Sequence, residues 1–294
     1  MIVDHTTESR SSDNISEFFS GRLLYGDDFP LEDITQWFED EKEGYANLTA
    51  VSPGAPRYYY HEVNKLYGYK YLAHKTYRNA LGLGSAWGFE FLPIIDRIKD
   101  LYILEPSDKL ISTKLGELSP IYSKPTISGE IAFPDNYFDL IVCFDVLHHI
   151  PNVSHIMAEM VRCMKPGGCL LLKEPIISMG DWRRPRPGLT MRERGIPLGY
   201  FREKINMLDV NILKESLLFT MTSFLTRKTV NILQKPIYSY KFYLLADQWL
   251  SKIFKNNVTY HPTTKWERIA PSEVFYVLEK YKSGPSFNHP PCKQ

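Results

Sequence analysis

The stretch Asn79-Ala80-Leu81-Gly82-Leu83-Gly84-Ser85-Ala86-Trp87-Gly88 decides the fold of this chain. An apolar, strand-like run enters it from Tyr77, and a helix-like segment over 89–99 leaves it. Glycine is needed where a chain turns tightly and where backbone approaches a ligand without an intervening Cβ. The free N–H groups at the start of the next helix point back at such a ligand. The pattern therefore predicts a strand, a ligand-binding turn and a helix.

An acidic residue follows the next strand-like run. Residues 101–104 are apolar and lead directly into Glu105. A carboxylate at the end of a second strand, about twenty residues beyond a glycine turn, can accept hydrogen bonds from the two hydroxyls of a ribose. The glycine turn and the acid together favour a nucleotide-like cofactor.

Strand-like and helix-like segments alternate from residue 76 onward, which is typical of a parallel sheet covered on both faces. Pro93 predicts a kink or a late start in the first helix, because proline has no N–H to donate. The fold class expected is α/β, with a doubly wound, mostly parallel sheet. The expected strands are 77–81, 101–104, 125–128, 139–144, 169–173, 217–224 and 272–279, and the expected helices between them are 89–99, 152–164 and 205–216.

The composition excludes several classes of protein. The 294 residues are 44% hydrophobic and 23% charged, and a formal net charge of +1 argues against a general nucleic-acid binder. Four cysteines, at 143, 163, 169 and 292, show no zinc-binding spacing. No apolar run is long enough to span a bilayer, and the N-terminus lacks a signal-like core. We therefore expect a cytoplasmic protein.

Five segments together resemble the class I S-adenosylmethionine-dependent methyltransferases of the small-molecule type. Gly82-Leu83-Gly84 is similar to the glycine loop of that family, and Leu104-Glu105-Pro106-Ser107 to its ribose-binding acid. Residues 133–141, 144–150 and 164–168 are similar to the segments around its fourth strand and before its fifth. The resemblance implies a seven-stranded Rossmann-like sheet with helices on both faces, and S-adenosylmethionine as the cofactor.

The chain departs from the family at three positions. Ala80 stands where the family usually has an acid, and Ala86 stands where it has a third glycine. Ile127 holds the place of an acid that often contacts the adenine edge, so Glu130 is the nearest substitute. These departures leave a non-catalytic, cofactor-binding relative as an alternative. The cofactor-binding residues that the resemblance implies are Gly82, Gly84, Ser85, Ala86, Trp87, Glu105, Pro106, Glu130, Phe144 and Asp145.

Asp145, His148 and His149 lie at the carboxyl end of the expected fourth strand, where open α/β sheets bind their ligands. A histidine titrates near neutrality and can take a proton from a hydroxyl group, or it can simply brace a loop. We expect the catalytic residues among these three. Adjacent histidines point in different directions, and no further ligand lies nearby in the sequence, so no metal site is expected.

An arginine cluster follows the expected fifth strand. Arg183, Arg184 and Arg186 lie in a segment rich in arginine, proline and glycine. Arginine binds carboxylate and phosphate groups bidentately, so the cluster predicts an anionic acceptor. The alternative is a solvated loop whose arginines pair with Asp181 and other nearby acids.

The leading hypothesis is methyl transfer to oxygen on an anionic small-molecule or sugar acceptor. A quinone- or lipid-type C-methyltransferase is an alternative. Asp145-Val146-Leu147-His148 disfavours a nucleic-acid base methylase, which carries an Asn/Asp-Pro-Pro-aromatic run at that place. The Lys165-Pro166-Gly167-Gly168 turn fits a nicotinamide-dependent dehydrogenase poorly. The expected organisation is a disordered stretch over 1–14, a helical cap over 15–75, a methyltransferase domain over 76–282 with acceptor-side insertions at 176–202 and 225–270, and a loose tail over 283–294.

Overall fold

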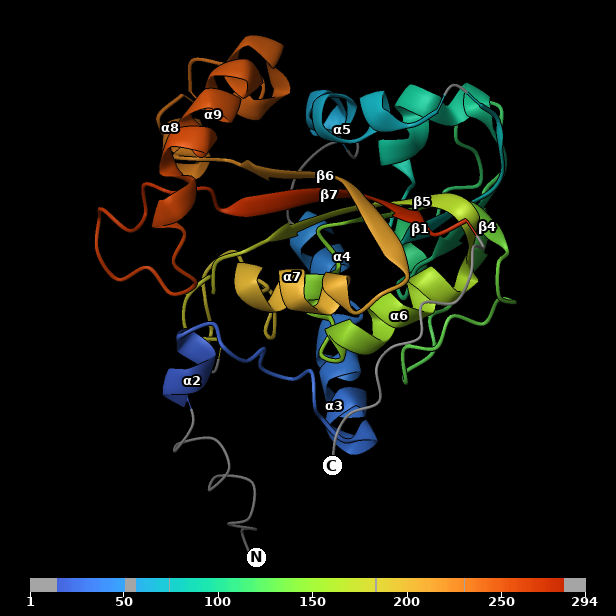
Figure 1. Ribbon diagram of the computed structural model, residues 1–294, viewed down its shortest axis with the longest axis horizontal. Coiled ribbons are helices and arrows are strands. Elements are labelled where there is room, and N and C mark those ends of the chain that lie inside the picture. The colour runs from blue at the N-terminus through green and yellow to red at the C-terminus, as the bar shows by residue number, and fades with distance from the viewer. Residues whose placement is uncertain (1–14, 51–56, 74, 183, 230, 283–294) are drawn as a thin grey trace, which may run out of the picture.

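The computed structural model describes residues 15–50, 57–73, 75–182, 184–229 and 231–282. At its centre is a seven-stranded sheet in the order β3-β2-β1-β4-β5-β7-β6 (Figure 1). Neighbouring strands from β3 to β5 run parallel, and β7 is antiparallel to both β5 and β6. This confirms the predicted fold class. The strands are β1 Tyr77–Leu83, β2 Ile98–Leu104, β3 Ile121–Ser123, β4 Phe138–Phe144, β5 Met164–Pro175, β6 Val210–Leu218 and β7 Glu273–Lys280.

The central strands are apolar on both sides because helices cover both faces of the sheet. Successive side chains of a strand point to opposite faces. Leu81 of β1 and Ile141 of β4 therefore belong to one core, whereas Ala80 and Leu140 belong to the other. The first core includes side chains of α6 and α7, and the second includes side chains of α5 and α9. The α-helices are α2 Ile15–Phe19, α3 Leu31–Glu41, α4 Gly44–Ala50, α5 His61–Tyr67, α6 Val153–Cys163, α7 Leu198–Asn206, α8 Thr222–Thr229 and α9 Lys241–Phe254.

Short 3₁₀ helices supply most of the remaining turns. The predicted helix over 89–99 is the 3₁₀ helix η2, Phe89–Arg97, with Pro93 inside it, and β2 begins directly afterwards at Ile98. A second one, η4, follows β4 and carries both histidines. The 3₁₀ helices are η1 Tyr69–Tyr71, η2 Phe89–Arg97, η3 Asp108–Leu110, η4 Leu147–His149, η5 Ile237–Ser239 and η6 Lys255–Asn257.

Three predicted elements are wrong. The strand expected over 125–128 is absent, and β3 lies earlier, at Ile121–Ser123; Pro125 cannot donate to a ladder, and Gly129 turns the chain at a φ of 89°. The helix expected over 205–216 is instead the end of α7 followed by β6. The strand expected over 217–224 ends at Leu218. Because β6 is an edge strand with a register shift between Ile212 and Lys214, its sequence lacks a regular alternation.

The predicted stretch 1–14, the tail 283–294 and Arg183 lie outside the described residues. Among those that are described, none of the helices combines the length and the apolarity that a membrane span requires.

Candidate active site

A cavity of about 660 Å³ lies at the carboxyl ends of the central parallel strands. That volume is in the range typical of sites for cofactors and small ligands. The turn after β1, Glu105 after β2 and the segment 144–152 after β4 form one part of its wall. Side chains of α3 and α4 line it as well, so the N-terminal helices border the same cavity as the sheet.

The turn after β1 requires glycine for steric reasons. Gly84 has a φ of 60°, and a Cβ there would lie 2.6 Å from a methyl carbon of Val146. A Cβ on Gly82 would lie 2.3 Å from the hydroxyl oxygen of Ser85. Ala86, in place of the third glycine, adopts a φ of 44°. A left-handed conformation costs a residue with a Cβ about 1–2 kcal/mol, so the turn keeps its shape at a modest energetic cost.

Glu105 is fixed by two backbone N–H groups. Its Oε1 accepts from Ser107 N at 3.0 Å, and its Oε2 accepts from Ala86 N at 3.1 Å. Burial raises the pKa of this carboxyl, while the two hydrogen bonds act in the opposite direction. A carboxylate oxygen can accept more than one hydrogen bond, so lone pairs remain for a ribose diol. The structure brings together on the cavity wall all the predicted cofactor-binding residues except Gly82: Gly84, Ser85, Ala86, Trp87, Glu105, Pro106, Glu130, Phe144 and Asp145.

A second acid on the cavity wall, Glu90, is not among the site residues predicted from the sequence. It lies in the first turn of η2, lines the cavity and is only 6% exposed. Burial raises its pKa to about 7. Ala80, which stands at the position of the family's usual acid, is fully buried in the core beside Leu140. The one feature of the sequence that points to Glu90 as a site residue is its position directly after Gly88-Phe89, because it follows the glycine turn.

His148 is held by Glu174, another residue that the sequence analysis did not select. Glu174 ends β5 and is fully buried. Its carboxylate accepts the N–H groups of Val146 at 2.9 Å and Leu147 at 2.7 Å, and its Oε2 lies 2.8 Å from His148 Nδ1. Burial lowers the pKa of His148 to about 3, so the ring is neutral. With Nδ1–H donated to the carboxylate, Nε2 is the nitrogen that can accept a proton.

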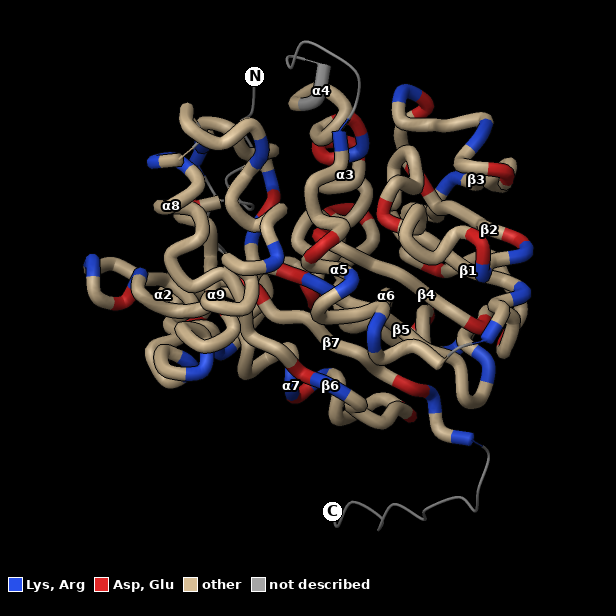
Figure 2. The backbone as a smooth tube through the Cα atoms, turned by 90° about the horizontal axis from the view of Figure 1, so that it is seen from above, with Lys and Arg blue, Asp and Glu red and all other residues tan. Residues whose placement is uncertain are grey.

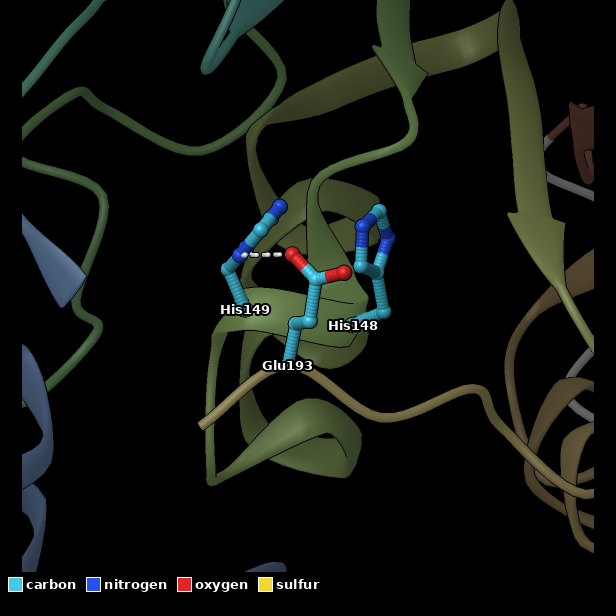
Figure 3. A group of neighbouring side chains, drawn as sticks. All are labelled: His148, His149 and Glu193. Atoms are coloured by element: carbon cyan, nitrogen blue, oxygen red, sulfur yellow. Dashed lines mark ion pairs between the residues drawn. The ribbon is translucent and has the colours of Figure 1, made fainter. Parts of the chain in front are cut away.

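His149 has the opposite electrostatic environment. Its Nδ1 lies 2.8 Å from a carboxylate oxygen of Glu41 in α3 and 3.7 Å from one of Glu193 (Figure 3). Burial alone would lower the pKa of His149, but the two carboxylates outweigh it and raise the pKa. The two adjacent histidines therefore differ in charge: His148 is neutral, whereas the raised pKa of His149 favours its charged form.

The donor atoms of His148, His149 and Glu193 all lie within 4.8 Å of one another, which is a set that could hold a divalent ion. In Figure 3 the carboxylate of Glu193 lies between the two imidazole rings. This set could not be predicted from the sequence, because Glu193 is distant from the histidines along the chain. In the structure, Glu193 also accepts hydrogen bonds from the N–H and hydroxyl groups of Thr190.

Asp145 is tied to a buried lysine. Lys173 of β5 is fully buried, donates to Asp145 and lies 3.4 Å from Glu273. The two carboxylates outweigh burial and raise the pKa of Lys173, which keeps its charge. Asp145 has a φ of 57°, so this ion pair fixes a strained turn after β4.

The two described residues of the arginine cluster, Arg184 and Arg186, do not line the cavity. Arg184 is highly exposed and lies 3.6 Å from Asp181, and Arg186 donates to backbone carbonyls, including that of Met179 at 3.2 Å. Both contacts agree with the alternative prediction, in which the arginines of this loop interact with other groups of the same loop. Arg194 is fully buried and donates to the carbonyl oxygens of Tyr25, His148 and Pro151, so it fixes the loop that carries the histidines.

Residues 81–172 match the family model described as a methyltransferase domain. The protein named "Phthiotriol/phenolphthiotriol dimycocerosates methyltransferase 1" of Mycobacterium ulcerans is 31% identical over 65 residues, which are 21% of this chain and 24% of that protein. "Probable methyltransferase ltbC" of Aspergillus luteorubrus is 33% identical over 73 residues, 24% of this chain and 26% of that protein. The chain thus matches about a quarter of the length of these curated relatives.

Among solved structures, the [4+2]-cyclase SpnF is similar in fold, with a TM-score of 0.53 and 11% identity over 87% of this chain and 98% of that one. The sheet order, the glycine turn and Glu105 agree with those expected of a class I S-adenosylmethionine-dependent methyltransferase, and residues 81–172 carry the matched methyltransferase domain. The match supports the predicted family and enzyme class, and it implies S-adenosylmethionine as the cofactor.

Proposed function

We propose that this chain methylates a hydroxyl oxygen of a small-molecule acceptor, with His148 as the general base. The observation that carries the proposal is the pair of Glu174 and His148. Glu174 holds Nδ1 of a neutral imidazole on the wall of the cavity that also contains Gly84 and Glu105. An oriented, unprotonated histidine beside a cofactor site can receive the proton of a hydroxyl group. Because the burial that keeps His148 neutral also weakens it as a base, the proposal requires Glu174 to stabilise the imidazolium as it forms.

The cofactor half of the cavity fits S-adenosylmethionine. Glu105 retains lone pairs for the ribose hydroxyls, and Gly84 keeps the wall free of a Cβ. We propose that Glu90 binds the ammonium group of the methionine moiety. Glu90 would thereby replace the acid that the family usually has at the position of Ala80. Burial destabilises the charged form of Glu90, and a cation beside it stabilises that form. The ammonium group of the ligand would therefore offset the cost of burying the Glu90 carboxylate. S-adenosylmethionine supplies the electrophilic methyl group when it is bound.

The other half of the cavity suits an acceptor with an apolar or aromatic body. Tyr45, Tyr58, Tyr60 and Tyr238 line it. Among the described residues, the lining includes seven carboxylic acids, two Lys or Arg side chains (Lys42 and Arg57) and His149. This balance favours a neutral acceptor over the anionic one that the arginine cluster predicts. We also retain the predicted organisation, with a helical cap over 15–75 and acceptor-side insertions at 176–202 and 225–270. The protein is further proposed to be cytoplasmic and to have no nucleic-acid partner.

In the proposed reaction the acceptor hydroxyl would give its proton to Nε2 of His148 as its oxygen takes the methyl group, whose bond to the cofactor's sulfur would break and leave a neutral thioether. Glu174 then stabilises the imidazolium. General base catalysis of this kind contributes about 10²–10⁴-fold to the rate, with the rest supplied by positioning. Burial raises the pKa of Glu174 to about 7, so we expect turnover to rise as the pH passes through that value and the carboxylate ionises.

The test is a methyl-transfer assay on a panel of hydroxylated acceptors, neutral and anionic. In His148→Asn the amide can still donate to Glu174, but no ring nitrogen remains to take a proton. We expect a loss of about 10²–10⁴-fold in turnover, smaller at high pH, with cofactor affinity unchanged. His149→Asn is the matched control and should lose less. Wild-type turnover in His148→Asn at every pH would exclude His148 as the base.

A further inference from the structure

An apolar stripe runs along the solvent side of α9. Phe242, Leu245, Trp249 and Ile253 are between 50% and 69% exposed. At 100° per residue all four lie within one narrow sector of the helix surface. The opposite side, with Tyr243, Leu244, Asp247 and Ser251, is buried against the domain. The helix is therefore apolar on two sides, of which only one is used by the fold.

The chain around this stripe is rich in cations. The segment 222–268 contains eight Lys and Arg residues and two acids, a net charge of +6 in a chain whose total is +1. Within the described residues none of the eight forms an ion pair with a carboxylate, and one of the two acids, Asp247, is buried. By helical geometry Lys241 and Lys252 lie along one flank of the stripe. Figure 2 shows Lys and Arg segments at the α8–α9 end of the molecule.

Two further exposed side chains extend the apolar character of this segment. Phe224 of α8 is 47% exposed, and Trp266 is 77% exposed. Figure 1 shows α8 and α9 together at one end of the molecule. An apolar stripe of four exposed side chains on one helix, flanked by lysines, exceeds the scattered exposure that is normal on a soluble surface.

We propose that the α8–α9 face, defined by Phe224, Phe242, Leu245, Trp249, Ile253 and the surrounding cations, docks onto the surface of an anionic lipid bilayer. An interfacial helix buries its apolar side at the boundary of headgroups and acyl chains, and its lysines meet the phosphates. Tryptophan and phenylalanine are typical of that boundary. The core of a protein–protein interface is depleted of lysine, so the charge pattern favours lipid over a protein partner. With 14 residues, α9 would lie in the interface plane.

The face is connected to the cavity. The 3₁₀ helix η5 packs against both α8 and α9, and its residue Tyr238 lines the cavity. Docking through α9 would therefore hold the cavity close to the bilayer. The proposal is independent of the assigned base and acceptor, because it rests on the exposed side chains and charge of the α8–α9 face and not on the cavity.

The test is co-sedimentation of the full chain with vesicles of phosphatidylcholine, alone or mixed with phosphatidylglycerol. We expect binding to the mixed vesicles, weakened by salt, and little binding to phosphatidylcholine alone. The double variants Phe242→Ser/Trp249→Ser and Lys241→Glu/Lys252→Glu should each lose about tenfold or more in vesicle partitioning. Met207→Ser, directly after α7 and at a side chain that is 69% exposed, is the matched control and should bind as the wild type does.

Circular dichroism of each variant verifies folding, which these exposed positions should leave intact. Absence of wild-type binding to the mixed vesicles would overturn the proposal, and so would equal binding by both double variants. A wild-type dimer that Phe242→Ser/Trp249→Ser converts to a monomer, without vesicle binding, would assign the face to contact between copies of the chain instead.

Discussion

Glu90→Gln gives the sharpest test of the cofactor site, because it removes a charge and keeps the size of the side chain. Burial raises the pKa of Glu90 from 4.5 to about 7 in the folded chain. A carboxyl whose folded pKa is raised stabilises the fold at low pH, and this contribution is lost as the pH rises through about 7. At 1.36 kcal/mol per pKa unit the loss is roughly 3 kcal/mol.

The assay is urea unfolding of the wild type and the variant at pH 5 and pH 8, without ligand. The free energy of unfolding should fall with pH in the wild type and fall less in Glu90→Gln, which does not titrate there. Part of the slope should remain, because burial also raises the pKa of Glu174 to about 7 and that of Glu273 to about 8. Glu203→Gln, at an exposed position, is the control and should keep the wild-type slope.

Calorimetry with S-adenosylmethionine then separates burial from function. If Glu90 receives the ammonium group, the variant should lose about 1.5–3 kcal/mol of binding, which is about 10–150-fold in Kd. An altered pH slope with an unchanged Kd would leave Glu90 a buried acid without a role in the cofactor site. Identical slopes and identical Kd values would refute the reasoning on both counts.

Three further outcomes follow from the same cavity. Glu105→Gln should raise the Kd of S-adenosylmethionine about 10–150-fold in calorimetry, because a neutral amide replaces a charged acceptor. Gly84→Ala should lower the free energy of unfolding by about 1–2 kcal/mol or more, since its φ is 60° and its new Cβ meets Val146, whereas Gly199→Ala in α7, where the space is open, should not destabilise the chain. Turnover should survive a chelator because His149 is already hydrogen-bonded to a carboxylate; a loss restored by a divalent cation would instead identify a metal site.

The interior of the sheet could be predicted from the sequence because helices cover both of its faces. Buried strands such as β1 and β4 read as continuous apolar runs, and the predicted segments fall inside them. The edge strands β3 and β6 carry no such run, because one side or one edge of each faces solvent. Their predicted positions are wrong for that reason.

The site divides in the same way. Gly84 and Glu105 could be found because each follows its strand at a fixed spacing, which a sequence records directly. Glu41, Glu174 and Glu193 reach the histidines from three distant segments, so their convergence depends on tertiary packing. No spacing rule connects them to the histidines in advance.

The two histidines illustrate what packing adds to a motif. As a dipeptide they are equivalent, and either could serve as the base. The fold places a backbone-bound carboxylate behind His148 and two carboxylates around His149. The charge favoured on His149 then lowers the pKa of His148 further, so His149 helps to keep His148 neutral. One pair of adjacent histidines thus supplies a neutral proton acceptor, His148, and a charged side chain, His149, that binds Glu41 of α3. The difference between the two histidines depends on Glu41. Because Glu41 belongs to α3, the N-terminal helices contribute to the electrostatics of the proposed base as well as to the cavity wall.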